Sequence, residues 1–170
     1  DAEERIISLS NIKTSEEFSK LEKLYREGLN PEKREDLSAA IKGRSNISNY
    51  LKGILQKASK EVIICTNAGE INFKLKLFQQ TLGELNKNNI KIKIALSGDE
   101  KLIKKIEKVL ETKIKKVDVD AKFFIVDKKE ILFYLSKNSD PNDTAIWLNS
   151  EFFSQAFATL FEKAIGGEEK

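Results

Sequence analysis

The sequence predicts an α/β domain in which helices flank a mixed β-sheet, preceded by an N-terminal helix. Two observations lead to this prediction. Apolar runs and helix-period segments alternate as strand–helix–strand–helix, then as a run of strands, then as a final helix. The run 123–126 is continuously apolar, which is typical of a strand covered on both faces.

Length and composition bound the class of protein. The 170 residues, 40% hydrophobic and 34% charged, suffice for one well-packed domain. No apolar run approaches the roughly 20 residues of a membrane-spanning helix. The single Cys65, within an apolar strand, excludes a disulfide framework, predicts a buried thiol and fits a cytoplasmic location. Without His the usual zinc sites cannot form, so no cofactor is predicted.

Charge and the first residues add two expectations. The net charge is +3, with only four arginines, and most lysines alternate with Glu or apolar residues. This pattern favours solvated helix faces over a nucleic-acid surface. The chain lacks signal-peptide character and has no Met, even at position 1, which predicts a processed product or a fragment of a longer protein.

The N-terminal segment is expected to be helical over residues 3–27, with a break near 13–15 and an end at Gly28. Two interpretations stay open: a coiled linker helix, or a helix packed on its own domain. The predicted domain division is a linker or dimerisation helix over 1–30 and an α/β domain over 31–170.

The α/β domain follows in order. After the lead-in 37–44, a helix capped by Ser45 or Asn46 buries a stripe that ends at Ala58. Further elements are predicted as strand 61–65, helix 71–85, strand 90–96, helix 100–111, strand 114–119, strands 123–126 and 131–136, loop 139–143 and strand 144–148. Ser150 is expected to cap the last helix, whose broad apolar face must be buried in the core or in a subunit contact.

Strand 123–126 and the next strand carry a motif. Lys122 and Asp127 fit the Lys and Asp of His-x-Lys-x-x-x-x-Asp, while Asp120 stands at the His position. Ser136 and Asn138 fit Gly-Ser-x-Asn if the connection is one residue longer, and Leu135 replaces the Gly. The pattern resembles the phospholipase D superfamily, which implies that fold.

The chemistry of that superfamily depends on a nucleophilic His, and this chain has none. A carboxylate at Asp120 would have to attack a phosphodiester while itself negative, with no imidazole to protonate the leaving group. The resemblance therefore implies a phospholipase D-like fold used for binding. The simpler alternative is that Lys122 and Asp127 are strand-end charges that face water.

A second resemblance covers roughly residues 21–165. It depends on Ile41-Lys-Gly-Arg44 within 35–47, the helix to Ala58, strand 61–65, and Leu21-x-x-Leu24-Tyr25-x-x-Gly28. These segments resemble the effector domain of archaeal TrmB-like transcriptional regulators, with the end of the linker helix before it. In that family a winged helix binds DNA, a coiled helix dimerises, and the effector domain senses a small molecule such as a sugar.

The chain departs from that family pattern at both ends. It has no room for the winged helix before Asp1, so DNA contact is expected only through a domain outside this chain. It also ends before the further domain that contributes to the sugar site in sugar-binding members. The implied small-molecule effector is therefore a sugar only if this chain binds one without that domain.

The resemblance implies a ligand site where strands end. The candidates are polar residues next to apolar strands: Thr66, Asn67, Ser97, Asp120, Lys122, Ser136 and Asn138. Helix capping by Thr66 or Asn67, and a turn at Ser97, are the alternatives. Lys122 is the strongest candidate, because a half-buried Lys beside Phe123 needs an anionic or carbonyl partner, which Asp120 or Asp127 would also satisfy.

The expected function is a ligand-sensing and dimerising effector domain of a transcriptional regulator, without enzymatic activity. A homodimer is expected because phospholipase D-like sites combine two motif copies and this chain holds one. Two alternatives stay open: a divergent phosphodiesterase or nuclease that uses Asp120 and Lys122, and a dimerisation scaffold without a ligand.

Overall fold

The computed structural model describes residues 37–136 and 140–166, together with Ser19. Internal contacts divide the chain into residues 1–36 and 37–170, and the second unit holds all the elements described below. Apart from Ser19, the helix predicted over 3–27 and the linker predicted over 1–30 lie outside the described residues. The predicted domain boundary therefore stays a prediction.

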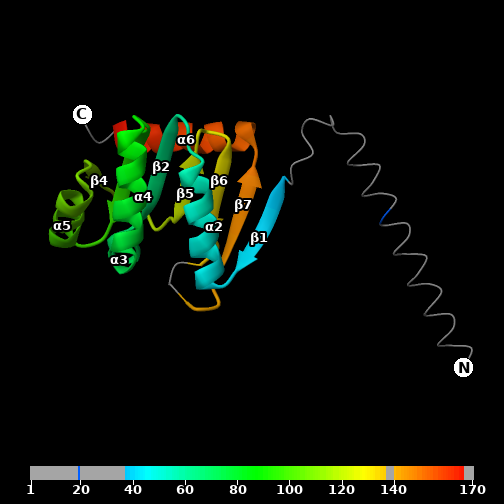
Figure 1. The fold of residues 1–170 in the computed structure, drawn as a ribbon, viewed down its shortest axis with the longest axis horizontal. Coiled ribbons are helices and arrows are strands. Elements are labelled where there is room, and N and C mark those ends of the chain that lie inside the picture. The colour runs from blue at the N-terminus through cyan, green and yellow to red at the C-terminus, as the bar shows by residue number, and fades with distance from the viewer. Residues whose placement is uncertain (1–18, 20–36, 137–139, 167–170) are drawn as a thin grey trace, which may run out of the picture. The chain divides into compact units, whose positions relative to one another are not determined.

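A seven-stranded mixed sheet, with strand order β1-β7-β6-β5-β2-β3-β4, forms the centre of the described part (Figure 1). The strands are β1 (Ser38–Lys42), β2 (Glu61–Asn67), β3 (Lys91–Ser97), β4 (Ile114–Lys116), β5 (Phe123–Val126), β6 (Glu130–Tyr134) and β7 (Thr144–Asn149). Strands β2, β3 and β4 are parallel, and the pairs β2–β5, β5–β6, β6–β7 and β7–β1 are antiparallel. The predicted mixed sheet is confirmed.

Helices cover both faces of this sheet. They are α2 (Arg44–Gln56), α3 (Ala68–Phe73), α4 (Leu75–Lys87), α5 (Glu100–Leu110) and α6 (Glu151–Gly166). Figure 1 shows α2, α3 and α4 in front of the sheet and α6 crossing the strands behind it. The result is three layers, because each apolar sheet face needs a helix to exclude water.

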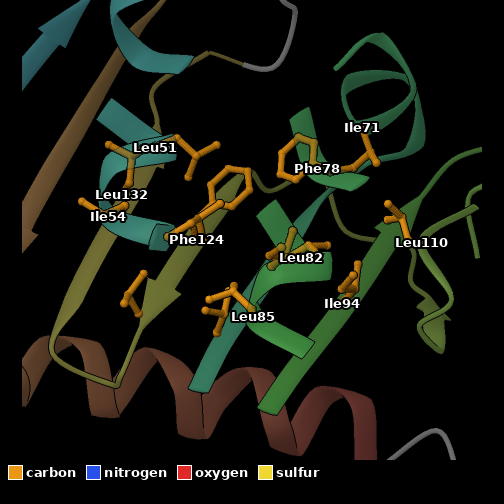
Figure 2. Packing of buried hydrophobic residues seen from close by; sticks show 14 of the residues in the cluster. Leu51, Ile54, Ile71, Phe78, Leu82, Leu85, Ile94, Leu110, Phe124 and Leu132 are labelled. Carbon is orange, nitrogen blue, oxygen red and sulfur yellow. The ribbon is translucent and has the colours of Figure 1, made fainter. Parts of the chain in front are cut away.

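Alternation along β5 divides the core in two. Phe124 packs in the larger cluster with α2 and α4, whereas Phe123 packs in the smaller one beneath α6. Figure 2 shows Phe124 facing Phe78 of α4, with ring centroids 6.2 Å apart. All four β5 residues are buried, which confirms the prediction of a strand covered on both faces.

Two predictions about helices are wrong. Helix α2 begins after Gly43, and neither Ser45 nor Asn46 caps it. Gly43 has φ 94° and donates its N–H to the carbonyl of Asp143, so glycine provides the start that a side chain was expected to provide. The single helix predicted over 71–85 is two helices, α3 and α4, separated at Lys74.

Other boundaries also differ. Strand β1 was predicted only as a lead-in, and β2 extends two residues further than expected, through Thr66 and Asn67. The predicted cap of α6 is confirmed, since the N–H of Phe153 donates to Ser150 Oγ at 3.1 Å. Part of the apolar face of α6 stays open, with Phe152 86% and Leu160 65% exposed.

Candidate ligand-binding site

Several strand ends meet at one edge of the sheet. Cys65 pairs with Phe123 and Phe123 with Phe133, which joins the carboxyl ends of β2 and β6 to the amino end of β5. Strand β3 ends beside them, because Asn67 pairs with Ser97. A cleft of about 810 Å³ opens at this edge.

Five of the seven predicted residues line the cleft, namely Asn67, Ser97, Asp120, Lys122 and Ser136. The rest of the wall consists of Gly98, Asp118, Val119, Ala121, Phe123, Phe133, Tyr134, Leu135, Phe153 and Phe157. Five segments thus contribute to one cavity: the end of β2, the end of β3, residues 118–123 leading into β5, residues 133–136 at the end of β6, and the start of α6.

The other two predicted residues are placed differently. Thr66 lies inside β2, is fully buried and is not part of the cleft wall. Its hydroxyl has no hydrogen-bond partner in the described part of the chain. Asn138 lies outside the described residues.

Two of the lining residues also have structural partners. The side chain of Asn67 accepts a hydrogen bond from the N–H of Glu70 at 2.8 Å and so caps α3. The hydroxyl of Ser136 donates to the carboxylate of Asp143. Both side chains are therefore held in one orientation. A ligand that contacts them would lose little of its binding free energy to ordering these side chains.

Lys122 lies in a buried group of charges. Its Nζ is 3.9 Å from Glu70 Oε2 and 5.4 Å from the ring centroid of Tyr134. Lys74 contacts the other oxygen of Glu70 at 3.1 Å. A buried ammonium group needs such partners, since burial alone would disfavour its charge.

Tyr134 is part of the same group. Burial raises the pKa of its hydroxyl above the ordinary value, and the charges of Glu70 and Asp143 raise it further, against a smaller opposing effect of Arg44. The Tyr134 hydroxyl is buried and has no hydrogen-bond partner among the described residues. It is thus a neutral donor at the edge of the cleft.

Asp127, the other end of the motif, is far from the cleft. Its carboxylate accepts hydrogen bonds from the N–H groups of Ser59, Lys60 and Glu61 at 2.7–3.2 Å and from the Ser59 hydroxyl at 3.1 Å. Partial burial raises the pKa of Asp127, but these hydrogen bonds outweigh it and lower the pKa below the ordinary value. The expectation that Asp127 could be the partner of Lys122 is therefore wrong.

The sequence prediction missed Glu70 and the aromatic wall. Glu70 stands three residues after the capping Asn67, the spacing of a helix capping box, and this spacing could have marked it. No local signal indicates that its side chain meets Lys122. Phe153 and Phe157 of α6 were predicted only as part of an apolar face, without a role in the site.

The wall combines two kinds of surface. Rings cluster on one side, with Phe123 and Phe157 centroids 5.1 Å apart and Phe153 and Phe157 centroids 5.4 Å apart. Amide, hydroxyl, carboxylate and ammonium groups occupy the strand ends. Ligand pockets commonly pair apolar walls with a few fixed polar groups, so the cleft suits a small organic molecule.

The described part of the chain shows neither a reactive thiol nor a group of metal ligands. Burial raises the pKa of the Cys65 thiol to about 11, so this side chain is a buried thiol, as predicted, rather than a nucleophile. Among residues 37–136 and 140–166, no group of three or more His, Cys, Asp and Glu side chains is arranged to hold a metal ion. None of the described helices is long and apolar enough to cross a membrane.

Comparison with solved structures defines the class of fold. Nuc from Salmonella typhimurium, a phospholipase D family member, superimposes with a TM-score of 0.56 at 11% identity, over 75% of this chain and 92% of Nuc. NucT from Helicobacter pylori gives 0.58 at 13% identity, over 76% of this chain and 95% of NucT. At such identities the likeness shows the fold, which is phospholipase D-like as predicted.

The particular family follows from the sequence. The family model described as transcriptional regulator TrmB, EBD N-terminal subdomain, matches residues 39–165, and the chain belongs to this family. The archaeal chromatin protein TrmBL2 superimposes with a TM-score of 0.58 at 18% identity, over 96% of this chain and 65% of TrmBL2. The chain thus spans about two thirds of TrmBL2, whose structure shows a novel mode of DNA binding. No protein of curated function matches the sequence.

Proposed function

We propose that this chain is a dimerising effector domain of a TrmB-type transcriptional regulator and that a small molecule binds in the cleft at the strand ends. The observation that supports it most is the cleft itself. Five polar residues chosen from the sequence line it together with four phenylalanines. Membership in a family of transcriptional regulators supplies the regulatory context.

Binding, rather than hydrolysis, is the proposed use of this cleft. The chain has no His, and Asp120 occupies the position of the nucleophile in the related motif. Lys122 lies against Glu70 and the ring of Tyr134. In our proposal Lys122 and the Ser97 and Ser136 hydroxyls orient an uncharged hydroxyl- or carbonyl-bearing ligand, while the phenylalanines cover its apolar side. DNA binding would belong to a part of the regulator other than this domain.

A thermal-shift panel tests the ligand. Wild-type protein is heated with sugars, sugar phosphates, nucleotides and short DNA. A ligand at 100 times its dissociation constant should add about 2.7 kcal/mol to the free energy of unfolding. The shift should disappear in Lys122→Gln, where Glu70 keeps Lys74 as its partner, and should persist in Lys129→Gln at the far end of the same hairpin.

Dimerisation is the second part of the proposal. The outward face of α6 exposes Phe152 and Leu160, and the cleft rim exposes Val119 and Leu135. Large apolar side chains left exposed on a folded domain are candidates for a protein contact. A second copy of the chain is the proposed partner, as one site built from two motif copies would require.

Light scattering at micromolar concentration tests the dimer. Wild type should have twice the mass of the chain, and Leu160→Glu should shift the protein toward the monomer, because an unpaired charge would enter the contact. Lys52→Glu, an exposed position on α2 across the sheet, is the matched control and should leave the mass unchanged. A monomeric wild type would contradict the dimer, and a dimer without any ligand shift would favour a scaffold.

A further inference from the structure

The group formed by Glu70, Lys74 and Lys122 is unusual for its burial. The side chains are 7%, 9% and 5% exposed, respectively. Charged side chains are almost never buried to this degree unless they are paired. Glu70 divides its carboxylate between the two lysines, with Oε1 3.1 Å from Lys74 and Oε2 3.9 Å from Lys122.

The two lysines and Glu70 are arranged like an oxyanion-binding site in which the Glu70 carboxylate takes the place of a bound anion. Two ammonium groups converge on the two oxygens of one carboxylate, as they would on two oxygens of a bound phosphate, sulfate or carboxylate. The occupant is part of the protein. Asn67 fixes its position by accepting the Glu70 N–H, and this same Asn67 lines the cleft.

We infer that Glu70 is a built-in counter-ion of Lys122, the lysine of this group that lines the cleft, and that it makes the cleft disfavour anionic ligands, an inference that rests on the proposed function of the cleft. A ligand phosphate near Lys122 would meet the charge of Glu70 and would have to displace it. Asp118 and Asp120 on the cleft wall add repulsion of the same sign. Glu70 is thus a specificity-determining residue, and the effector class is organic molecules without a phosphate or carboxylate group.

Removal of the counter-ion should reverse this preference. Glu70→Ala deletes the carboxylate and leaves room for an oxyanion beside Lys74 and Lys122. Inorganic phosphate should then raise the thermal midpoint of the variant by several degrees, saturably, above a chloride control of equal ionic strength. Wild type should show no such rise, and neither should Glu84→Ala, an exposed position on α4.

Two further variants make the test specific. Glu70→Gln removes the charge but keeps the side-chain volume, so its response to phosphate should be smaller than that of Glu70→Ala. The double variant Glu70→Ala/Lys122→Gln should lose the response. If Glu70→Ala does not fold, Glu70→Ala/Lys74→Gln serves instead, because it keeps the net charge of the group and retains Lys122.

Two results would overturn the inference. One is a saturable rise of the thermal midpoint of wild type with phosphate. The other is a folded Glu70→Ala or Glu70→Ala/Lys74→Gln variant whose thermal midpoint does not change with phosphate. These results are separable from failure of the proposed function. A wild type that responds to no ligand of the panel removes the proposed sensor, whereas a phosphate response in Glu70→Ala would still identify Glu70 as the counter-ion.

Discussion

The two ends of strand β5 carry charges of opposite kind, and they serve different purposes. At the carboxyl end, Asp127 is held by backbone N–H groups of residues 59–61, which tie the β5–β6 turn to the start of β2. At the amino end, Lys122 lies beside a cleft, where its ammonium group contacts the carboxylate of Glu70 and the ring of Tyr134. One sequence motif therefore combines a structural residue with a candidate ligand-binding residue.

The Asp127 end is reinforced by further contacts. Both Asp127 and Lys128 have positive φ, as the central residues of a type I′ turn require. Lys93 contacts Glu61 at 3.0 Å and Glu162 at 2.7 Å, which joins β2, β3 and α6. The Asp127 end is therefore stabilised by several hydrogen bonds and ion pairs, whereas a cleft opens at the Lys122 end.

The largest expected effect comes from the strand between the two ends. Phe124→Ala removes a fully buried ring that packs on Phe78, and should lower the free energy of unfolding by about 3–5 kcal/mol. Urea denaturation would measure this loss. A loss below about 1 kcal/mol would show that the layer between the sheet and α4 is not packed as described.

The second-largest effect is expected for Asp127→Ala, which should lower the free energy of unfolding by roughly 2–4 kcal/mol. The variant leaves three backbone N–H groups without their acceptor and places Ala at a positive φ. Asp127→Asn keeps one acceptor oxygen and tolerates this φ, so its loss in urea denaturation should be smaller. Equal stability of Asp127→Ala and wild type would contradict the structural role.

Acid should weaken the same end selectively. The folded-state pKa of Asp127 lies below its unfolded value of about 3.9, so its contribution is present above that pH and is lost as the pH falls through the folded pKa. Glu162 behaves alike, because its hydrogen bond with Lys93 lowers its pKa against the opposing effect of burial. The thermal midpoint of wild type should decrease when the pH is lowered below about 4. In the same pH range, the difference in thermal midpoint between wild type and Asp127→Asn should become smaller.

The smallest effect is expected at the ion pairs of α6. Glu162→Gln removes the partner of Lys93 and Lys128, but Glu162 is 38% exposed and Glu61 still pairs with Lys93. We expect a loss below about 1 kcal/mol in low salt, and less in high salt. A loss equal to that of Asp127→Ala would make the ion pairs, rather than the backbone hydrogen bonds, the main support of this end.

Much of the fold could be predicted because its signals are local. The apolar run of β5, the Ser150 cap and the stripe of α2 each depend on residues close in sequence. Strand β1 could not be predicted, because Ser38–Lys42 has weak strand propensity and gains its pairing from β7. The break at Lys74 was hidden, since Ile71 and Phe78 on either side of it both reach the core.

The site was predictable only in part. Polar residues at strand ends were visible, and the topology brings Asn67, Ser97 and Lys122 to one cleft. The contact of Glu70 with Lys122 and the binding of Asp127 to residues 59–61 join segments far apart in sequence. Sequence periodicity does not indicate such long-range contacts. The partners of the charged residues could therefore be identified only in the structure.

The different roles of the two ends of β5 can be tested by comparing Lys122→Gln with Asp127→Asn. For each variant, the midpoint of unfolding and the shift caused by the effector found in the ligand panel are measured together. We expect that Asp127→Asn loses stability and keeps the effector shift, while Lys122→Gln stays nearly as stable as wild type and loses the shift. An effector shift that survives in Lys122→Gln, or that falls in parallel with stability in both variants, would contradict the separation of the two ends.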